Sequence, residues 1–284
     1  MPWSNVSIDE CHIISDFSPE NNTRINENEL NSDFLLISSN PGQSTRIESS
    51  LRAAYTQHNS GIDCLATLTL RDLSPLAIRS MILGLLMWKV KGAVVLAGDP
   101  PKSPNAKSLD DRSHRTTTMI KELQTLLKEN SIESDAFKLG SVIDLGDSLE
   151  NAVKLTCSKL ENGVDFFVTQ PVFSVAKIHE FESMLFERIK RPLEARIYYG
   201  LQLLRQGSIS FTDIPYAIQE EVAAGLDNTE SLTEMASLLM SSGHRSFYTV
   251  APIFPGGKRD YDICKSFNTT LKSMYQGTQG AGAD

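Results

Sequence analysis

Residues 93–101 read AVVLAGDPP, an apolar run that ends in Gly98, Asp99 and two prolines. An apolar run without polar alternation is typical of a parallel strand that is buried on both faces. A carboxylate directly after such a strand is either an ordinary turn residue or an acid held at the carboxyl end of a sheet. The stretch alone leaves both interpretations open.

Seven further stretches have the same strand-like character. The eight runs are 12–17, 34–39, 64–70, 93–99, 136–143, 165–171, 196–202 and 246–254. Amphipathic helix patterns lie between most of them, at 45–57, 75–90, 116–130, 148–161, 175–189 and 232–241. This alternation predicts an α/β protein with a single (β/α)8 TIM barrel. The alternative, an open doubly wound sheet, would usually show a glycine-rich first turn, and neither GxGxxG nor a P-loop motif occurs.

Two segments depart from the regular alternation. Residues 18–33 are polar and show no clear helix, and the connection at 203–230 is long enough to carry an extra helix at about 214–224. The last residues, GTQGAGAD, are rich in glycine and predict a disordered tail. We therefore expect a barrel domain over residues 1–276 and a tail over 277–284.

Composition limits the classes of function. The net charge is −8, which argues against general binding to nucleic acids or anionic membranes. The four cysteines form no CxxC pair and show no zinc-ligand spacing, so no metal site is expected. The polar N-terminus does not resemble a signal peptide, and the most apolar stretch, 78–90, is too short to span a bilayer. These features predict a reduced, cytoplasmic protein.

In a TIM barrel the active site lies where the carboxyl ends of the strands meet. The polar residues at or near those ends are Asp16, Ser38, Thr67, Asp99, Gln170, Tyr199 and Gln202. This set holds carboxylates, amides and hydroxyls but no histidine, which suits recognition of a flat polar heterocycle with a carboxyl as acid or base. Asp16 and Asp99 also fit turns, and Thr67 is an ordinary strand residue.

Two motifs carry a family resemblance, VVLAGDPP at 94–101 and FFVTQPVF at 166–173, supported by IISDFSPE at 13–20 and FYTV at 247–250. With these motifs in this order, the chain resembles the methylenetetrahydrofolate reductase family. The resemblance implies a TIM barrel that reduces 5,10-methylenetetrahydrofolate to 5-methyltetrahydrofolate, or catalyses the reverse. It also implies FAD as the hydride carrier and NAD(P)H as the hydride source.

The resemblance assigns roles to residues that match the motifs. Asp16 would protonate the folate, Asp99 would lie between flavin and pterin, and Gln170 would bind the pterin. Phe173, Tyr199 and Gln202 would complete the substrate site. The residues expected on the cofactor side are Ser38, Thr67, Gly98 and Lys159.

The chain departs from the family pattern mainly on the flavin side. Asp16 stands in place of a glutamate, Ala97 in place of an arginine and Thr67 in place of a histidine. Because the flavin-phosphate residues are eroded while the pterin residues remain, we expect weak or absent FAD binding and hydride transfer directly from a nicotinamide.

Two alternative functions stay open at this point. One is a non-catalytic folate-binding protein on the same barrel, or a partner subunit. A second is an unrelated barrel lyase or aldolase, for which Lys138 is the nearest candidate lysine. The sequence also allows a homo-oligomer.

Overall fold

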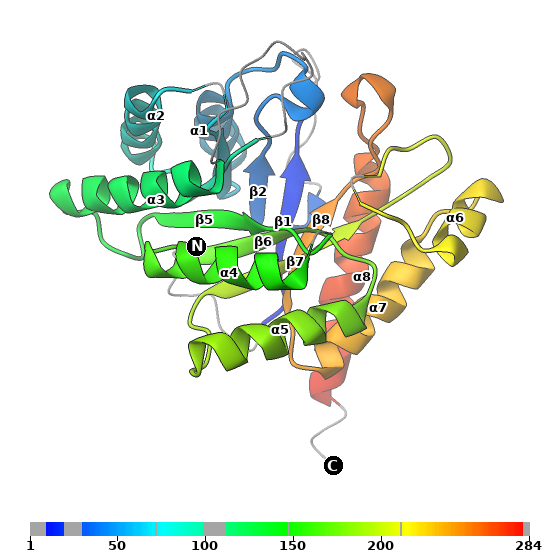
Figure 1. Ribbon diagram of the computed structural model, residues 1–284. Helices are drawn as coiled ribbons and strands as arrows, with labels where there is room; N and C mark the ends of the chain where they lie inside the picture. Colours follow the sequence, from blue (N-terminus) through cyan, green and yellow to red (C-terminus); the bar gives the residue numbers. More distant parts are fainter. Residues whose placement is uncertain are drawn as a thin grey trace, which may run out of the picture.

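The computed structural model describes residues 10–19, 30–71, 73–98, 112–146, 148–210 and 212–280, and it shows a closed barrel of eight parallel strands (Figure 1). The strands follow one another around the barrel in sequence order, and β8 pairs with β1 to close it. The predicted TIM barrel is confirmed. The strands are β1 (His12–Phe17), β2 (Phe34–Ile37), β3 (Cys64–Thr69), β4 (Gly92–Leu96), β5 (Lys138–Ile143), β6 (Phe166–Pro171), β7 (Arg196–Gln202) and β8 (Ser246–Val250).

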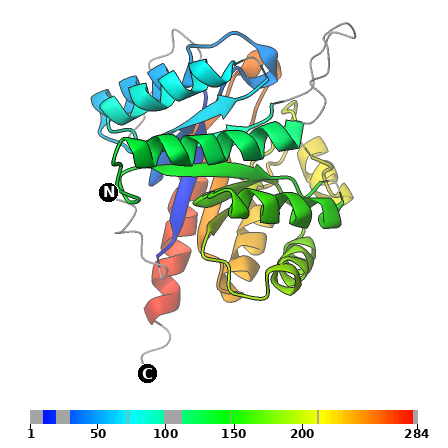
Figure 2. The same cartoon turned by 60° about the vertical axis from the view of Figure 1, so that its left-hand side comes forward.

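Helices surround the barrel, as the two ribbon views show (Figures 1 and 2). They are α1 (Ser49–Ser60), α2 (Pro75–Met87), α3 (Arg112–Glu129), α4 (Leu149–Glu161), α5 (Val175–Ile189), α6 (Tyr216–Ala223), α7 (Thr229–Ser241) and α8 (Tyr261–Gly280). One helix follows each strand from β2 to β6, whereas α6 and α7 both follow β7. The predicted extra helix in the β7–β8 connection is therefore confirmed as α6. Residues 20–29 of the β1–β2 connection lie outside the described part of the chain.

Two apolar layers hold the barrel together. Alternate strand residues point inward and outward. The inward ones form a buried interior cluster made of Ile14, Phe34, Leu36, Leu65, Val94, Phe166, Val168 and Tyr198. The outward ones, such as Ile13, Tyr199 and Phe247, join a larger cluster between strands and helices. Because both faces are buried, the strands read as continuous apolar runs.

Several boundaries differ from the predicted ones for local reasons. The helix expected from residue 45 begins at Ser49, because the Glu48 carboxylate accepts hydrogen bonds from the N–H groups of Ser50 and Leu51. The strand expected over 93–99 ends at Leu96, shortly before Gly98, which has a φ of 87°.

The final helix, α8, was not among the helices predicted from the sequence. Phe267 and Leu271 are fully buried and anchor it on the barrel. The domain boundary expected at residue 276 falls inside α8, because each residue added to a formed helix gains a backbone hydrogen bond. Residues 281–284 of the expected tail lie outside the described residues. Within the described part, no helix combines the length and apolar character needed to cross a bilayer.

Candidate functional site

The carboxyl ends of the strands meet at one end of the barrel, here called the mouth. Among the predicted site residues, Asp16, Ser38, Gly98, Gln170 and Gln202 lie at or just beyond strand ends there. The structure thus brings half of the ten predicted residues to the mouth. Asp99 lies outside the described residues, so its contacts are not part of the geometry below.

Asp16 is the centre of a buried polar cluster. Its Oδ1 accepts hydrogen bonds from Ser38 Oγ at 2.5 Å and from the Tyr248 hydroxyl at 3.3 Å. Its Oδ2 accepts from Arg259 Nε at 3.0 Å in an ion pair whose side chains are only 5% and 3% exposed. Both carboxylate oxygens are therefore engaged by the chain itself.

Arg259 reaches this cluster from the β8–α8 connection, and sequence reasoning missed it. The connection folds back on itself, so that Ile253 and Arg259 form an isolated antiparallel bridge. Gly256 and Gly257 make the reversal with φ values of 82° and 84°, a conformation that glycine adopts without strain. The adjacent glycines were the signal that the chain turns back toward the mouth here.

The Asp16 cluster also perturbs its neighbours. Burial raises the pKa of the Tyr248 hydroxyl well above its usual value, and the charge of Asp16 raises it further. Burial lowers the pKa of Arg259, but the neighbouring Asp16 more than offsets this effect and the net shift is upward. At neutral pH the carboxylate is thus surrounded by a neutral phenol and a charged guanidinium.

The end of β6 is irregular where Gln170 lies. Pro171 has no N–H to donate, and the register between β6 and β7 shifts between Val168 and Pro171. The Gly200 N–H instead donates to Thr169 Oγ1 at 2.7 Å. Irregularities of this kind redirect side chains near functional sites. The half-buried Gln170 amide has no hydrogen-bond partner among the described residues, which leaves it available to a ligand.

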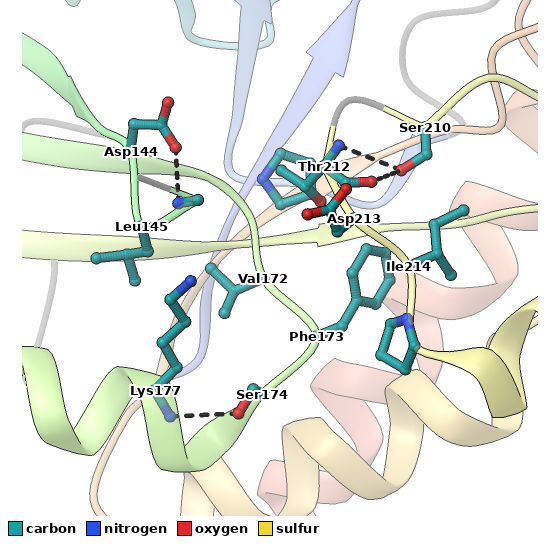
Figure 3. Close-up of a pocket in the computed structure, with 13 residues that line it drawn as sticks. Asp144, Leu145, Val172, Phe173, Ser174, Lys177, Ser210, Thr212, Asp213 and Ile214 are labelled. Atoms are coloured by element: carbon teal, nitrogen blue, oxygen red, sulfur yellow. Dashed lines mark hydrogen bonds between the residues drawn. The ribbon is translucent and has the colours of Figure 1, made fainter. Parts of the chain in front are cut away.

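A cavity of about 690 Å³ begins at Pro171 and extends between three connections at the mouth (Figure 3). Phe173, one of the predicted substrate residues, lines it, and Figure 3 shows its ring near Ile214 and Asp213. Lys177 extends from the first turn of α5 into the same space, and Asp144 lies at the opposite side. The cavity therefore combines an aromatic ring, one cation and two carboxylates.

Tyr199, expected to contact substrate, lies on the other side of its strand. Its side chain belongs to the layer between barrel and helices, where its hydroxyl donates to Glu182 of α5 and its ring packs edge-on against His244 at 5.2 Å. Burial raises the pKa of Glu182, but hydrogen bonds from His244 and Tyr199 outweigh it and lower the pKa overall. This placement favours a supporting role for Tyr199 over substrate contact.

Gln202, also expected to contact substrate, supports the β7–β8 connection. It is fully buried, and its Nε2 donates to the carbonyl of Ile209 at 2.8 Å. Asn228 completes the arrangement, since its side chain accepts from Leu204 N at 2.7 Å and donates to the carbonyl of Gln202 at 3.0 Å. The two amides hold the segment that carries α6, and Asn228 was not predicted from the sequence.

The residues expected on the cofactor side have mixed placements. Ser38 is engaged by Asp16, and Thr67 is only 8% exposed. Gly98 packs so closely that a Cβ there would meet Thr69 Cγ2 at 2.3 Å. The positive φ and this contact explain why the position is a glycine.

Three cations considered for a flavin pyrophosphate are not free, although such a group needs free cations or helix N-terminal amides. Lys159 lies between α4 and β5, where its Nζ donates to the carbonyl of Val142, and burial lowers its pKa to about 8. Arg259 is paired with Asp16, and Arg71, beside Gly98, is also engaged. The predicted role of Lys159 in cofactor binding thus has no support in its geometry.

Two other expectations concern lysine and metal chemistry. Lys138 is the first residue of β5, at the barrel end opposite the mouth, and its Nζ lies 3.7 Å from Asp165. It is therefore not in position for the aldolase chemistry considered above. In the described ranges, no group of three or more His, Cys, Asp or Glu side chains is arranged to hold a metal ion.

Comparison with protein-family models shows to which family the chain belongs. The sequence profile of the family described as methylenetetrahydrofolate reductase matches residues 20–240. The chain belongs to the methylenetetrahydrofolate reductase family. The match spans β2 to β7 and includes the Gln170 segment, so the predicted resemblance is confirmed. No curated protein matches this chain in sequence.

Solved structures with the same fold are distant in sequence. One is an uncharacterized protein from Clostridium thermocellum, described as binding two copies of 5-methyl-5,6,7,8-tetrahydrofolic acid. Its TM-score is 0.61 at 13% sequence identity, and the alignment covers 94% of this chain and 96% of that chain. A 2,3-dimethylmalate lyase of the PEP mutase/isocitrate lyase superfamily has a TM-score of 0.50 and 12% identity, with 97% and 83% covered. At these identities the likeness shows the fold alone.

Proposed function

We propose that this protein binds a reduced folate at the barrel mouth and interconverts 5,10-methylenetetrahydrofolate and 5-methyltetrahydrofolate by hydride transfer. Membership of the family supports this proposal, as does the folate bound by the Clostridium thermocellum protein of the same fold. The observation that carries it is the Gln170 amide, which has no hydrogen-bond partner in the described part of the chain and directly precedes Pro171, a residue that lines the mouth cavity. A pterin offers paired donors and acceptors that one amide can satisfy.

The cavity suits the rest of a folate molecule. With the pterin at Gln170, the aminobenzoyl ring would extend past Pro171 and pack against Phe173. The glutamate carboxylate would then reach Lys177, the cation among the cavity-lining residues. Asp144 and Asp213 would remain at the rim, where solvent screens their charges.

The proposed reduction consumes one hydride and one proton. The hydride adds to the methylene carbon, the bond from that carbon to N10 breaks, and N10 takes the proton. We propose a nicotinamide as the direct hydride donor, because Ala97 and Thr67 replace the arginine and histidine of the family pattern on the flavin side. NAD(P)H is oxidised to NAD(P)+ in the same step.

The proton donor is proposed to be Asp99 rather than Asp16. Both oxygens of Asp16 already accept hydrogen bonds, and the Asp16 side chain is only 5% exposed. A general acid must come within hydrogen-bond reach of the atom it protonates. Asp16 is therefore a positioning residue that fixes the β8–α8 connection.

A second candidate function has an observation in its favour. If Asp16 is the family's proton donor and Arg259 has displaced it from that role, the barrel would bind folate without turnover. The engagement of Asp16 by Arg259 is the feature that favours this non-catalytic alternative.

A turnover assay separates the two functions. The measurement is oxidation of NAD(P)H that depends on methylenetetrahydrofolate, for wild type, for Asp99→Asn and for the control Asp135→Asn on an exposed turn far from the mouth. The proposal predicts turnover in wild type and in the control, and a loss of about 100-fold or more in Asp99→Asn, the usual range for a general acid. Folate binding without turnover would establish the non-catalytic alternative, and wild type that neither binds nor reduces folate would contradict both.

A further inference from the structure

Helices α1 and α2 lie side by side on the outside of the barrel and expose an unusual amount of apolar surface (Figures 1 and 2). The exposed side chains are Leu51, Tyr55, Leu76, Leu83, Met87 and Trp88, with exposed fractions between 44% and 75%. We call this set the α1–α2 apolar face. Single exposed apolar residues are normal on a protein surface, whereas a contiguous group marks an interaction site.

The sequence of α2 explains why the face exists. Its thirteen residues, PLAIRSMILGLLM, contain one charged residue, Arg79. Ile78, Ile82 and Leu85 pack against the barrel, but Leu76, Leu83 and Met87 recur on the opposite side at helical spacing. A helix that is apolar all round is normally covered on all sides. The barrel covers only one side of α2.

The two helices form one surface rather than two separate stripes. The His58 ring of α1 contacts the Trp88 ring at the end of α2 edge-on, at 5.4 Å. Gln57 Nε2 also donates to the carbonyl of Lys89 at 2.8 Å. Gly84 lies in the middle of the exposed side of α2, and a Cβ there would meet nothing within 4 Å, so a partner can approach closely.

We propose that the α1–α2 apolar face is the interface of a homodimer, in which the same face of a second copy covers it. The distribution of acidic residues is compatible with a second copy of the chain at this face. Neither helix contains Asp or Glu, although the chain carries 35 acidic residues and a net charge of −8. Two copies therefore meet at this face without repulsion between carboxylates of these helices, and apolar surfaces are complementary to themselves, as a twofold interface requires.

The exposed apolar area of the face also matches the apolar area that a dimer interface buries. At these exposed fractions each of the six side chains offers roughly 100 Å², so the face offers on the order of 600 Å² of apolar surface. A stable interface buries about 800 Å² per partner, of which roughly 65% is apolar in homodimers. The six side chains supply that apolar share without any rearrangement.

The test is the mass of the protein in solution, measured by size-exclusion chromatography with light scattering at micromolar concentration. Wild type is expected at twice the chain mass of 31.4 kDa, and Leu83→Glu/Met87→Glu at 31.4 kDa. The control is Leu238→Glu on α7, which places one glutamate at another exposed leucine and keeps the dimer mass.

Folding of the variants is checked by circular dichroism. If the double variant is unfolded, the single change Leu76→Glu in the exposed first turn of α2 replaces it, with the monomer mass again expected. A monomeric wild type would overturn the proposal, since the face would then serve some other partner. A wild-type dimer that survives the α2 changes, or that Leu238→Glu also dissociates, would overturn it too.

Discussion

At the residue scale, the buried ion pair between Asp16 and Arg259 is the feature with the largest expected effect. Arg259→Met leaves the 5% exposed Asp16 carboxylate without its cation. Removing one partner of a buried pair typically costs about 3–5 kcal/mol, because an uncompensated charge remains in a poorly hydrated place. Urea unfolding of Arg259→Met should show a loss of this size.

The double variant Asp16→Leu/Arg259→Met is the control for that prediction. Replacing both partners removes the unpaired charge, so it should cost clearly less than Arg259→Met alone. A loss below about 1 kcal/mol for Arg259→Met, the range of exposed pairs, would contradict the buried cluster.

At the element scale, Asn228 holds the segment that carries α6. Its side chain serves two buried backbone groups, the N–H of Leu204 and the carbonyl of Gln202. In Asn228→Ala both groups lose their partner, at about 1–3 kcal/mol each. We expect urea unfolding to show this loss and hydrogen exchange to show faster exchange in α6 than in β1. The control Asn130→Ala removes an exposed amide that donates to the carbonyl of Leu126, in the helix just before it, and should change little.

How far the sequence predicts the structure also differs between elements. The bounds of β1, β7 and α5 agree with the predicted runs, because β1 and β7 are runs of buried residues and Ser174 caps the amphipathic α5. The predicted strand over 246–254 ends at Val250, because its apolar continuation packs in the β8–α8 connection instead. Apolar character alone does not separate a strand from a buried connection.

The site shows the same limit. Gln170 lies at the predicted end of β6, since the motif and the proline fix its position. Tyr199 was placed on the wrong face of β7, because a strand buried on both faces shows no alternation that distinguishes inward from outward residues. Arg259 lies 243 residues away from Asp16, and although the adjacent glycines indicate a turn, no local pattern indicates which residue the turned segment contacts.

At the scale of the whole molecule, buried phenols and thiols set the stability at high pH. Burial raises the pKa of Tyr198 to about 12, and that of the Cys11 and Cys264 thiols to about 12 as well. The folded protein therefore keeps protons that the unfolded chain releases above the ordinary thiol and phenol values of about 8.5 and 10. The stability from these groups is fully present below about pH 8.5 and is lost as the pH rises toward 12.

This predicts a free energy of unfolding that falls steadily above about pH 9, measured by urea unfolding across that range. Tyrosinate absorbance of Tyr198 should appear together with unfolding rather than before it. Full tyrosine ionisation near pH 10 in a folded protein would contradict the burial described here.

The central claim is that a reduced folate binds at the mouth through Gln170, and calorimetric titration with 5-methyltetrahydrofolate tests it most directly. Wild type should bind saturably. Gln170→Ala, which loses two hydrogen bonds of about 0.5–1.5 kcal/mol each, should bind about 10-fold more weakly or worse. The control Gln206→Ala, an exposed amide in the turn after β7, should bind as wild type does. Absence of binding by wild type, or wild-type affinity in Gln170→Ala, would contradict the account.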